Sequence, residues 1–279
     1  MRKILIAGLV LVAAGCYQDR NKSIEIMNEG VEAGRQKLYD TAASKLKMAV
    51  QTDPTNAAAS YNLGLVYKDQ KKWPDAASAF SDAIKIDTEN PALHYELGDA
   101  LAEQNKFDDA QKEFEAAIKL DPQLYKAHYR LGAALQEQEK YREADTEYRK
   151  AIEANPRFVQ AYVKLGDLYL DNDYDKEAAQ VFQNAILAND GDAAAHAGLG
   201  EALMKQKQYE EAIKEYKRAL EISPEQYLAC YNVGHMYRLL GDKKNAKEWL
   251  QKFVTQYAGR GGPELAKAAS DEIYALDAP

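Results

Sequence analysis

Residues 91–124 read PALHYELGDALAEQNKFDDAQKEFEAAIKLDPQL, and their pattern is present seven times in this chain of 279 residues. Gly98 and Phe114 of this stretch recur 34 residues later as Gly132 and Tyr148, with no insertion or deletion between the copies. A fixed period of this size indicates stacked units, each of which buries an apolar face against its neighbours. One short unit and its repetition therefore decide the fold.

The repeats occupy residues 23–56, 57–90, 91–124, 125–158, 159–192, 193–226 and 227–260. Their eighth position is always glycine and their twentieth is always alanine, which gives Gly30, Gly64, Gly98, Gly132, Gly166, Gly200, Gly234 and Ala42, Ala76, Ala110, Ala144, Ala178, Ala212, Ala246. Glycine in a helix interior costs about 1 kcal/mol relative to alanine. Because this cost recurs at one phase of every repeat, we expect the two helices of each repeat to approach closely there.

The second half of each repeat carries an apolar stripe. Its twenty-fourth position is large in every copy: Leu46, Phe80, Phe114, Tyr148, Phe182, Tyr216 and Leu250. Together with the mostly small residues at positions 20 and 27, these side chains fall on one face of a helix. In four of the repeats a proline then ends this helix, because proline lacks a backbone donor. The pattern predicts a helix-turn-helix unit with these large side chains in its core.

A period of 34 with this order of residues resembles the tetratricopeptide repeat (TPR) family. The resemblance implies an all-α fold, a right-handed TPR superhelix (α-solenoid) of seven helix-turn-helix repeats in residues 23–260. Residues 261–279 are then a C-terminal capping helix that starts at Pro263. We expect the turn within the fifth repeat to differ in detail, because Tyr174 stands one place earlier than the aromatic residue of most other repeats.

Residues 1–15 have the features of a signal peptide. Arg2 and Lys3 precede an uncharged apolar run, residues 4–14, which is too short to span a bilayer as a helix. Small residues then stand directly before Cys16, and this order resembles the lipobox of bacterial lipoproteins. The alternatives are an ordinary signal peptide or a packed cysteine.

The lipobox resemblance implies that residues 1–15 are removed and that Cys16 carries lipid, typically diacylglycerol with palmitate. Residues 16–22 are then lipidated Cys16 and a short tether of at most about 20 Å. Tyr17 follows the cysteine where Asp would favour retention in the inner membrane. The expected location is the outer membrane of a Gram-negative bacterium, as a lipoprotein that faces the periplasm.

The charge balance is acidic. The net charge is −8, with 36 Lys and Arg against 44 Asp and Glu. An acidic surface argues against nucleic acid and against adhesion to anionic lipid as partners. We therefore expect the membrane to be reached only through the N-terminal lipid.

No known catalytic motif, phosphate loop or metal motif is present in the sequence. His94, His128 and His196 all occupy the fourth position of a repeat, which favours a packing role. Successive helices are roughly 8–10 Å apart, too far for these histidines to share a zinc ion. Cys230 has no intramolecular disulfide partner if Cys16 is lipidated. The sequence predicts a protein that is not an enzyme, with no cofactor, no metal and no small-molecule substrate.

The TPR resemblance also implies a partner-binding groove, lined by positions 2, 5, 9, 12 and 13 of each first helix. The groove residues predicted here are Tyr61, Tyr95, Asp99, Glu103, Tyr129, Glu137, Asp167, Asp171, Glu201 and Tyr231. They form a tyrosine ladder with acidic flanks, suited to a segment with basic and apolar side chains. The alternative is that the tyrosines are generic TPR residues and the acids are solvated. The family's clamp for a C-terminal carboxylate is absent, because position 9 is never asparagine.

The arrangement of lipobox and TPR array resembles outer-membrane assembly lipoproteins, such as type IV pilus pilotins and the TPR lipoprotein of the gliding-motility machinery. This implies a non-catalytic scaffold for protein–protein interaction that supports assembly of an envelope machine. The alternative is a regulatory adaptor for peptidoglycan synthesis or envelope proteolysis. In either case the partners are proteins of the cell envelope.

Overall fold

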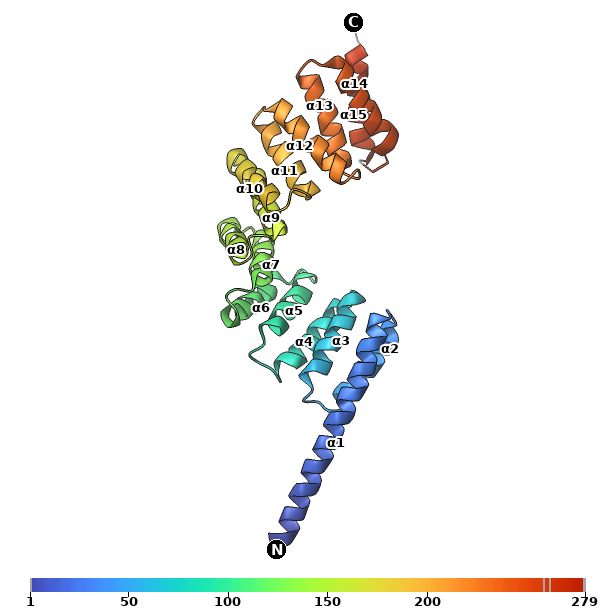
Figure 1. The fold of residues 1–279 in the computed structure, drawn as a ribbon, viewed down its shortest axis with the longest axis vertical. Coiled ribbons are helices and arrows are strands. Elements are labelled where there is room, and N and C mark those ends of the chain that lie inside the picture. The colour runs from blue at the N-terminus through green and yellow to red at the C-terminus, as the bar shows by residue number, and fades with distance from the viewer. Residues whose placement is uncertain (1, 258, 261, 278–279) are drawn as a thin grey trace. The chain divides into compact units, whose positions relative to one another are not determined.

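The computed structural model describes residues 2–257, 259–260 and 262–277, with side chains from residue 18 to residue 276. These residues form fifteen helices and no strand, which confirms the all-α prediction (Figure 1). The helices are α1 (Arg2–Arg35), α2 (Tyr39–Thr52), α3 (Ala57–Asp69), α4 (Trp73–Ile84), α5 (Pro91–Ala102), α6 (Phe107–Leu120), α7 (Tyr125–Glu137), α8 (Tyr141–Ala154), α9 (Val159–Asp171), α10 (Asp175–Ala188), α11 (Ala193–Lys205), α12 (Tyr209–Ile222), α13 (Tyr227–Leu239), α14 (Lys243–Tyr257) and α15 (Gly262–Asp277).

The chain divides into two compact units, an N-terminal unit, Met1–Ala144, and a C-terminal unit, Asp145–Pro279. In the N-terminal unit α1 packs against α2, α3 against α4 and α5 against α6, and each second helix also packs against the first helix of the next pair. The C-terminal unit repeats this order with α9 to α14, and α15 packs against α14. Both units are therefore stacks of helix-turn-helix repeats, as the sequence period predicts.

The glycine at position 8 lies directly against the large side chain at position 24 of the same repeat. A Cβ atom at Gly98 would lie 2.8 Å from the ring of Phe114, and one at Gly166 would lie 2.5 Å from the ring of Phe182. Both rings are fully buried. Real Cβ atoms do not approach other heavy atoms so closely, so the helices of a repeat can pack at this distance only with glycine. This confirms the predicted reason for the glycine.

The turn between the two helices has the same backbone in all seven repeats. Its central residue adopts a positive φ: Lys37, Lys71, Asn105, Glu139, Asp173, Lys207 and Gly241. In the fifth repeat Asp173 has φ 60°, within a few degrees of the other non-glycine residues. The expectation of a different turn there was wrong. The fifth repeat differs in the position of its aromatic residue, which is one place earlier than in most other repeats. This residue, Tyr174, packs edge-on against Tyr169 with the ring centroids 6.2 Å apart.

The first helix begins well before the first repeat. α1 runs without a break from Arg2 to Arg35, so the predicted tether at residues 16–22 is helical rather than extended. Ser23 is the first buried residue, and its hydroxyl donates to the carbonyl of Ala49 at 2.8 Å. A helix rises 1.5 Å per residue, which places Cys16 about 10 Å before this point along the axis. In the part of the chain that the structure describes, no helix is both long enough and apolar enough to cross a membrane.

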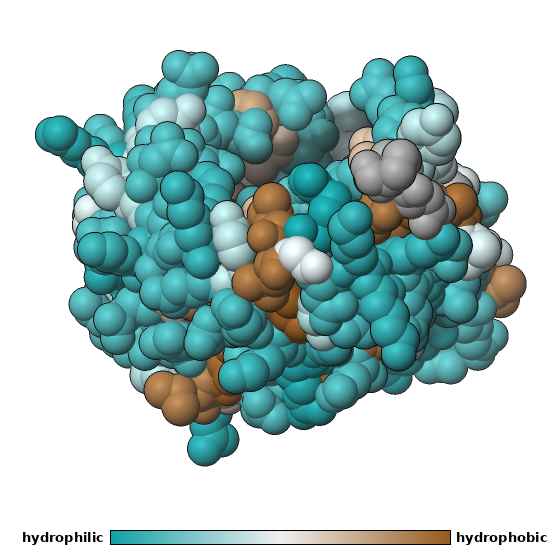
Figure 2. Space-filling model, turned by 90° about the horizontal axis from the view of Figure 1, so that it is seen from above, coloured by the Kyte–Doolittle hydropathy of each residue, from teal (hydrophilic) through white to brown (hydrophobic). Residues whose placement is uncertain are grey.

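Most of the visible surface is hydrophilic, and apolar residues gather in small patches (Figure 2). Leu187 and Tyr274 are the most exposed of the large apolar side chains described, at 84% and 81%. Single exposed apolar residues are common on soluble domains.

Candidate partner-binding surfaces

The predicted tyrosine ladder of the N-terminal unit is half-buried. Tyr61 on α3 and Tyr95 on α5 lie against the core rings of Phe80 and Phe114, with ring centroids 5.9 and 6.1 Å apart. The prediction that Phe80 and Phe114 are buried is confirmed. Residues that line a groove are expected to be largely exposed, and these tyrosines meet that expectation only in part, since each ring packs with one side on the core. What remains for a partner is the outer part of each ring.

Asp99 is the clearest departure from the expected groove. It is buried, with 7% of its surface exposed, although the sequence predicts it to line an open groove. Lys68 of α3 approaches its carboxylate at 2.7 Å, and Arg130 of α7 forms a second, short ion pair with it. Asp99 therefore joins three successive first helices. A buried carboxylate is tolerated here because cations from both neighbouring repeats pair with it.

Two other acids beside Asp99 are paired as well. Lys68 lies 2.6 Å from Glu96, and Arg130 lies 3.1 Å from Glu103. Burial lowers the pKa of Lys68, but its hydrogen bonds to Asp99 and Glu96 outweigh that effect and hold the pKa above its ordinary value. Burial, followed by the nearby charge of Asp99, raises the pKa of Tyr95 to about 12. At neutral pH the protonated ring of Tyr95 therefore lies beside three carboxylates that share two cations.

Two cavities open along this wall. One, of about 620 Å³, is lined by Lys68, Lys71, Trp73, Tyr95, Asp99, Glu103 and Arg130. The other, of about 290 Å³, lies between α5 and α7 and has Glu103, Arg130 and Glu137 in its lining. The predicted residues Tyr95, Asp99, Glu103 and Glu137 are thus brought to one surface, which we name the α3–α5–α7 wall. Tyr61 lines a separate cavity of about 250 Å³, and Tyr129 is half-buried on α7.

The predicted groove acids of the C-terminal unit differ, because they are not paired with a described residue. Asp167 and Asp171 lie on α9 and Glu201 lies on α11, and none of the three forms an ion pair with a described residue within 4.0 Å. Burial raises the pKa of Asp167 to about 6. Lys164 opposes this shift, while the charges of Asp171 and Glu201 add to it. This second surface, the α9–α11 wall, keeps the acidic character that the sequence predicts.

Tyr231, the last residue of the predicted ladder, already has a partner within the chain. Its hydroxyl donates to the carboxylate of Glu272 on α15 at 2.8 Å. The same carboxylate lies 2.8 Å from His235 and accepts from Arg238 at 2.7 Å. Glu272 was not predicted from the sequence, because α15 lies outside the repeat register. The inner face of α13 is therefore occupied by the capping helix.

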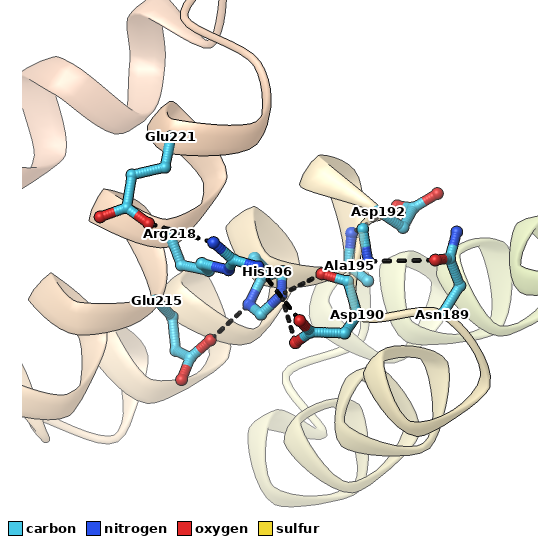
Figure 3. Close-up of polar contacts among 9 residues, drawn as sticks. Asn189, Asp190, Asp192, Ala195, His196, Glu215, Arg218 and Glu221 are labelled. Carbon is cyan, nitrogen blue, oxygen red and sulfur yellow. Dashed lines mark hydrogen bonds and ion pairs between the residues drawn. The ribbon is translucent and has the colours of Figure 1, made fainter.

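The histidines at position 4 hold the two helices of a repeat together. His196 is buried, and its ring nitrogens lie 2.7 Å from the carboxylate of Glu215 on α12 and 3.1 Å from the carbonyl of Asp190 (Figure 3). Tyr162 makes the equivalent bond to the carbonyl of Pro156 at 3.3 Å. Position 4 thus supplies a polar link between the first helix and the preceding loop, a role that the predicted packing function did not include.

Two other predictions concern reactive groups. Cys16 lies in α1, but its side chain is outside those that the structure describes. Cys230 is fully buried, and burial raises the pKa of its thiol to about 11. Among the described residues, no group of three or more His, Cys, Asp or Glu side chains is placed to hold a metal ion.

Comparison with solved structures finds other repeat proteins. YrrB, described as a TPR protein with an unusual peptide-binding site, is 25% identical and covers 70% of this chain and 99% of its own, with a TM-score of 0.58. MamA is 25% identical and covers 58% of this chain and 94% of its own, with a TM-score of 0.56. PilF of Pseudomonas aeruginosa is 18% identical and covers 77% of this chain and 97% of its own, with a TM-score of 0.66. At this identity the similarity to PilF is one of fold alone.

Comparison with curated protein sequences gives no match. Models of the tetratricopeptide repeat match residues 27–91, 67–135, 129–186 and 227–258, and a TPR repeat model matches residues 200–241. These matches cover both units and agree with the helix-turn-helix stacks and the glycine contacts described above. The chain belongs to the tetratricopeptide repeat family.

Proposed function

We propose that this protein is an interaction scaffold that binds a peptide segment of a protein partner along the α3–α5–α7 wall. The observation that carries the proposal is the 620 Å³ cavity, which places an aromatic ring, Tyr95, beside fixed charges of both signs. Aromatic rings offer large contact area at low entropic cost, and fixed charges give orientation. The resemblance to YrrB, a protein with a peptide-binding site, supports the same mode of binding.

Photo-crosslinking in cells tests this proposal directly. A photoreactive phenylalanine analogue at Tyr95 should capture one protein, through one segment that mass spectrometry identifies. The matched control is the same analogue at Lys119, which is exposed on α6. A synthetic copy of the captured segment should bind the chain, and Tyr95→Ala should weaken that binding at least tenfold by speeding dissociation. Equal capture at both positions, or unchanged affinity in the variant, would contradict the proposal.

We also propose that the scaffold is a lipoprotein anchored through Cys16 in the outer membrane and facing the periplasm. The support is the order of signal core, small residues and cysteine in the sequence. Two or more acyl chains hold a protein stably at a membrane, at about 0.8 kcal/mol per buried CH₂. Since α1 is continuous, the first repeat would lie within about 10 Å of the lipid along that helix.

Acyl labelling and cell fractionation test the anchor. Wild-type protein should incorporate labelled fatty acid and sediment with membranes, while Cys16→Ala should be unlabelled and should remain soluble or uncleaved. Unlabelled wild-type protein in the soluble fraction would remove this part of the proposal. A short, lipid-bound scaffold suits an assembly factor of an envelope machine, of the pilotin or gliding-motility kind, and the protein captured at Tyr95 identifies which machine it serves.

A further inference from the structure

The inner face of α13 contains a complete set of donors for one carboxylate. Tyr231, His235 and Arg238 are four and three residues apart, so they share one side of the helix. Tyr231 donates to one oxygen of Glu272 at 2.8 Å, and the Nε group of Arg238 donates to the other oxygen at 2.7 Å. The Nδ1 atom of His235 lies 2.8 and 3.1 Å from the two oxygens. Both carboxylate oxygens are therefore bound by groups from a single helix.

Two of the donors have support other than Glu272. The ring of Tyr231 stacks on that of His235 with centroids 5.9 Å apart, and it also packs edge-on against the buried ring of Phe253 at 5.6 Å. Such support positions these two rings before a ligand arrives. Charge-assisted hydrogen bonds are roughly twice as strong as neutral ones, so a carboxylate is the ligand that this site favours.

The carboxylate that occupies the site belongs to a helix with little apolar burial. Ala269 is the one residue of α15 that is fully buried among those described, while Leu265, Ile273 and Leu276 pack only partly against the core. Helices α2 to α7 and α9 to α14 each bury at least three residues. α15 packs against α14, and the described hydrogen bonds that join it to α13 all end on Glu272.

We propose that Tyr231, His235 and Arg238 form a carboxylate-binding site that α15 keeps closed through Glu272, and that an acidic helical segment of another protein binds there when α15 leaves. The occupant is inferred from the chain's own example, a helix that presents one glutamate to the inner face of α13. This site lies in the C-terminal unit, whereas the proposed peptide site lies in the N-terminal unit. The two proposals therefore succeed or fail separately.

Hydrogen exchange of the full chain is the first test. Glu272→Gln keeps the shape of the side chain but removes its charge, and we expect the amides of α15 to exchange at least tenfold faster. The matched control is Asp271→Asn, which makes the same change of charge at the adjacent, exposed residue. The control should exchange as wild type does. Unchanged exchange in Glu272→Gln, or an equal increase in both variants, would overturn the proposal.

Binding of a probe peptide is the second test. The probe is a fluorescent peptide with the sequence of residues 262–276, GPELAKAASDEIYAL. Apparent affinity scales with the fraction of molecules whose site is open. The Glu272→Gln chain should therefore bind the probe at least tenfold more tightly than the wild-type chain, and the Asp271→Asn chain should not. A probe with Gln at the position of Glu272 should bind neither chain.

A receptor-side variant separates binding from unfolding. Adding Arg238→Gln to the Glu272→Gln chain should abolish probe binding, while circular dichroism shows the helical content of the parent. If the Glu272→Gln chain binds the probe no better than wild type, or binds the Gln probe equally well, α15 is a structural cap only and the proposal is wrong.

Discussion

The two units place acids at equivalent repeat positions, yet the acids have opposite surroundings. Asp99 and Asp167 are both at position 9 of their repeats. Asp99 is buried between Lys68 and Arg130, whereas Asp167 forms no ion pair with a described residue and burial raises its pKa to about 6. The neighbouring repeats decide the difference. In the N-terminal unit the cations come from position 12 of the preceding repeat and from position 6 of the following repeat. The charge of a groove residue is thus set by contacts between repeats, while the contact of the position-8 glycine with the position-24 side chain is set within each repeat.

The core should respond alike in both units. Gly98→Leu and Gly166→Leu each push a side chain into a buried ring, so each should lower the free energy of unfolding by about 1–3 kcal/mol. Urea unfolding measures the loss. The control is Gly259→Ala, since nothing lies within 4 Å of the added atom at that position. A large loss in one unit alone would show that the two units do not share one packing rule.

The paired and unpaired acids should respond with opposite signs. Asp99→Asn removes the charge that pairs with Lys68 and Arg130, and it should destabilise the chain by about 1–3 kcal/mol at pH 7.5. Asp167→Asn should instead stabilise it by roughly 1–2 kcal/mol, after allowance for solvent screening. Urea unfolding at several pH values measures both. The same sign for the two variants would show that ion pairing does not decide how a charge at position 9 affects stability.

The pH dependence of the Asp167 effect follows from its raised pKa. The folded state holds the Asp167 proton up to about pH 6, whereas an ordinary aspartate has a pKa of 3.8. Below about pH 4 both states are protonated, so ionisation carries no penalty. The penalty grows as pH rises from about 4 to 6 and is complete above pH 6. The advantage of Asp167→Asn should therefore be absent at pH 3.5 and constant from pH 6.5 upward.

The sequence predicts contacts within a repeat better than contacts between repeats. The glycine at position 8 and the ring at position 24 belong to one repeat, so their contact follows from the period alone. The burial of Asp99 depends on side chains from two other repeats, and which side chains meet there is set by the packing between repeats. Lys68 is at position 12, one of the positions expected to line the groove, but Arg130 is at position 6 and gave no signal of its own. Glu272 could not be placed, since α15 is outside the repeat register.

Unpaired acids should attract cations over a distance. A lysine-rich fluorescent peptide should associate with the chain more slowly, by a few-fold at 20 mM salt, when Asp171→Asn and Glu201→Gln are combined. At physiological ionic strength screening acts over about 8 Å, so the difference should shrink there. The control pair, Glu96→Gln with Glu103→Gln, changes acids that are already paired and should have a smaller effect. Stopped-flow fluorescence gives the rates, and an equal effect of both pairs would show that the α9–α11 wall has no special role.

The smallest expected effect lies in the turns, which are alike in both units. Lys207 has φ 63° and Asn105 has φ 59°, a left-handed conformation that costs a residue with a side chain roughly 1–2 kcal/mol, though asparagine tolerates it better. Glycine removes this strain but also gives the unfolded chain more freedom, which offsets about 0.4–1 kcal/mol. Lys207→Gly should therefore stabilise the chain by about 0.5 kcal/mol, and Asn105→Gly should be close to neutral.

In the opposite direction, Gly241→Ala should destabilise the chain, because the backbone of Gly241 has φ 77°. Thermal unfolding of the three variants side by side resolves the order, and a larger gain for Asn105→Gly than for Lys207→Gly would mean that contacts of the lysine side chain, rather than its backbone, set the stability of the turn.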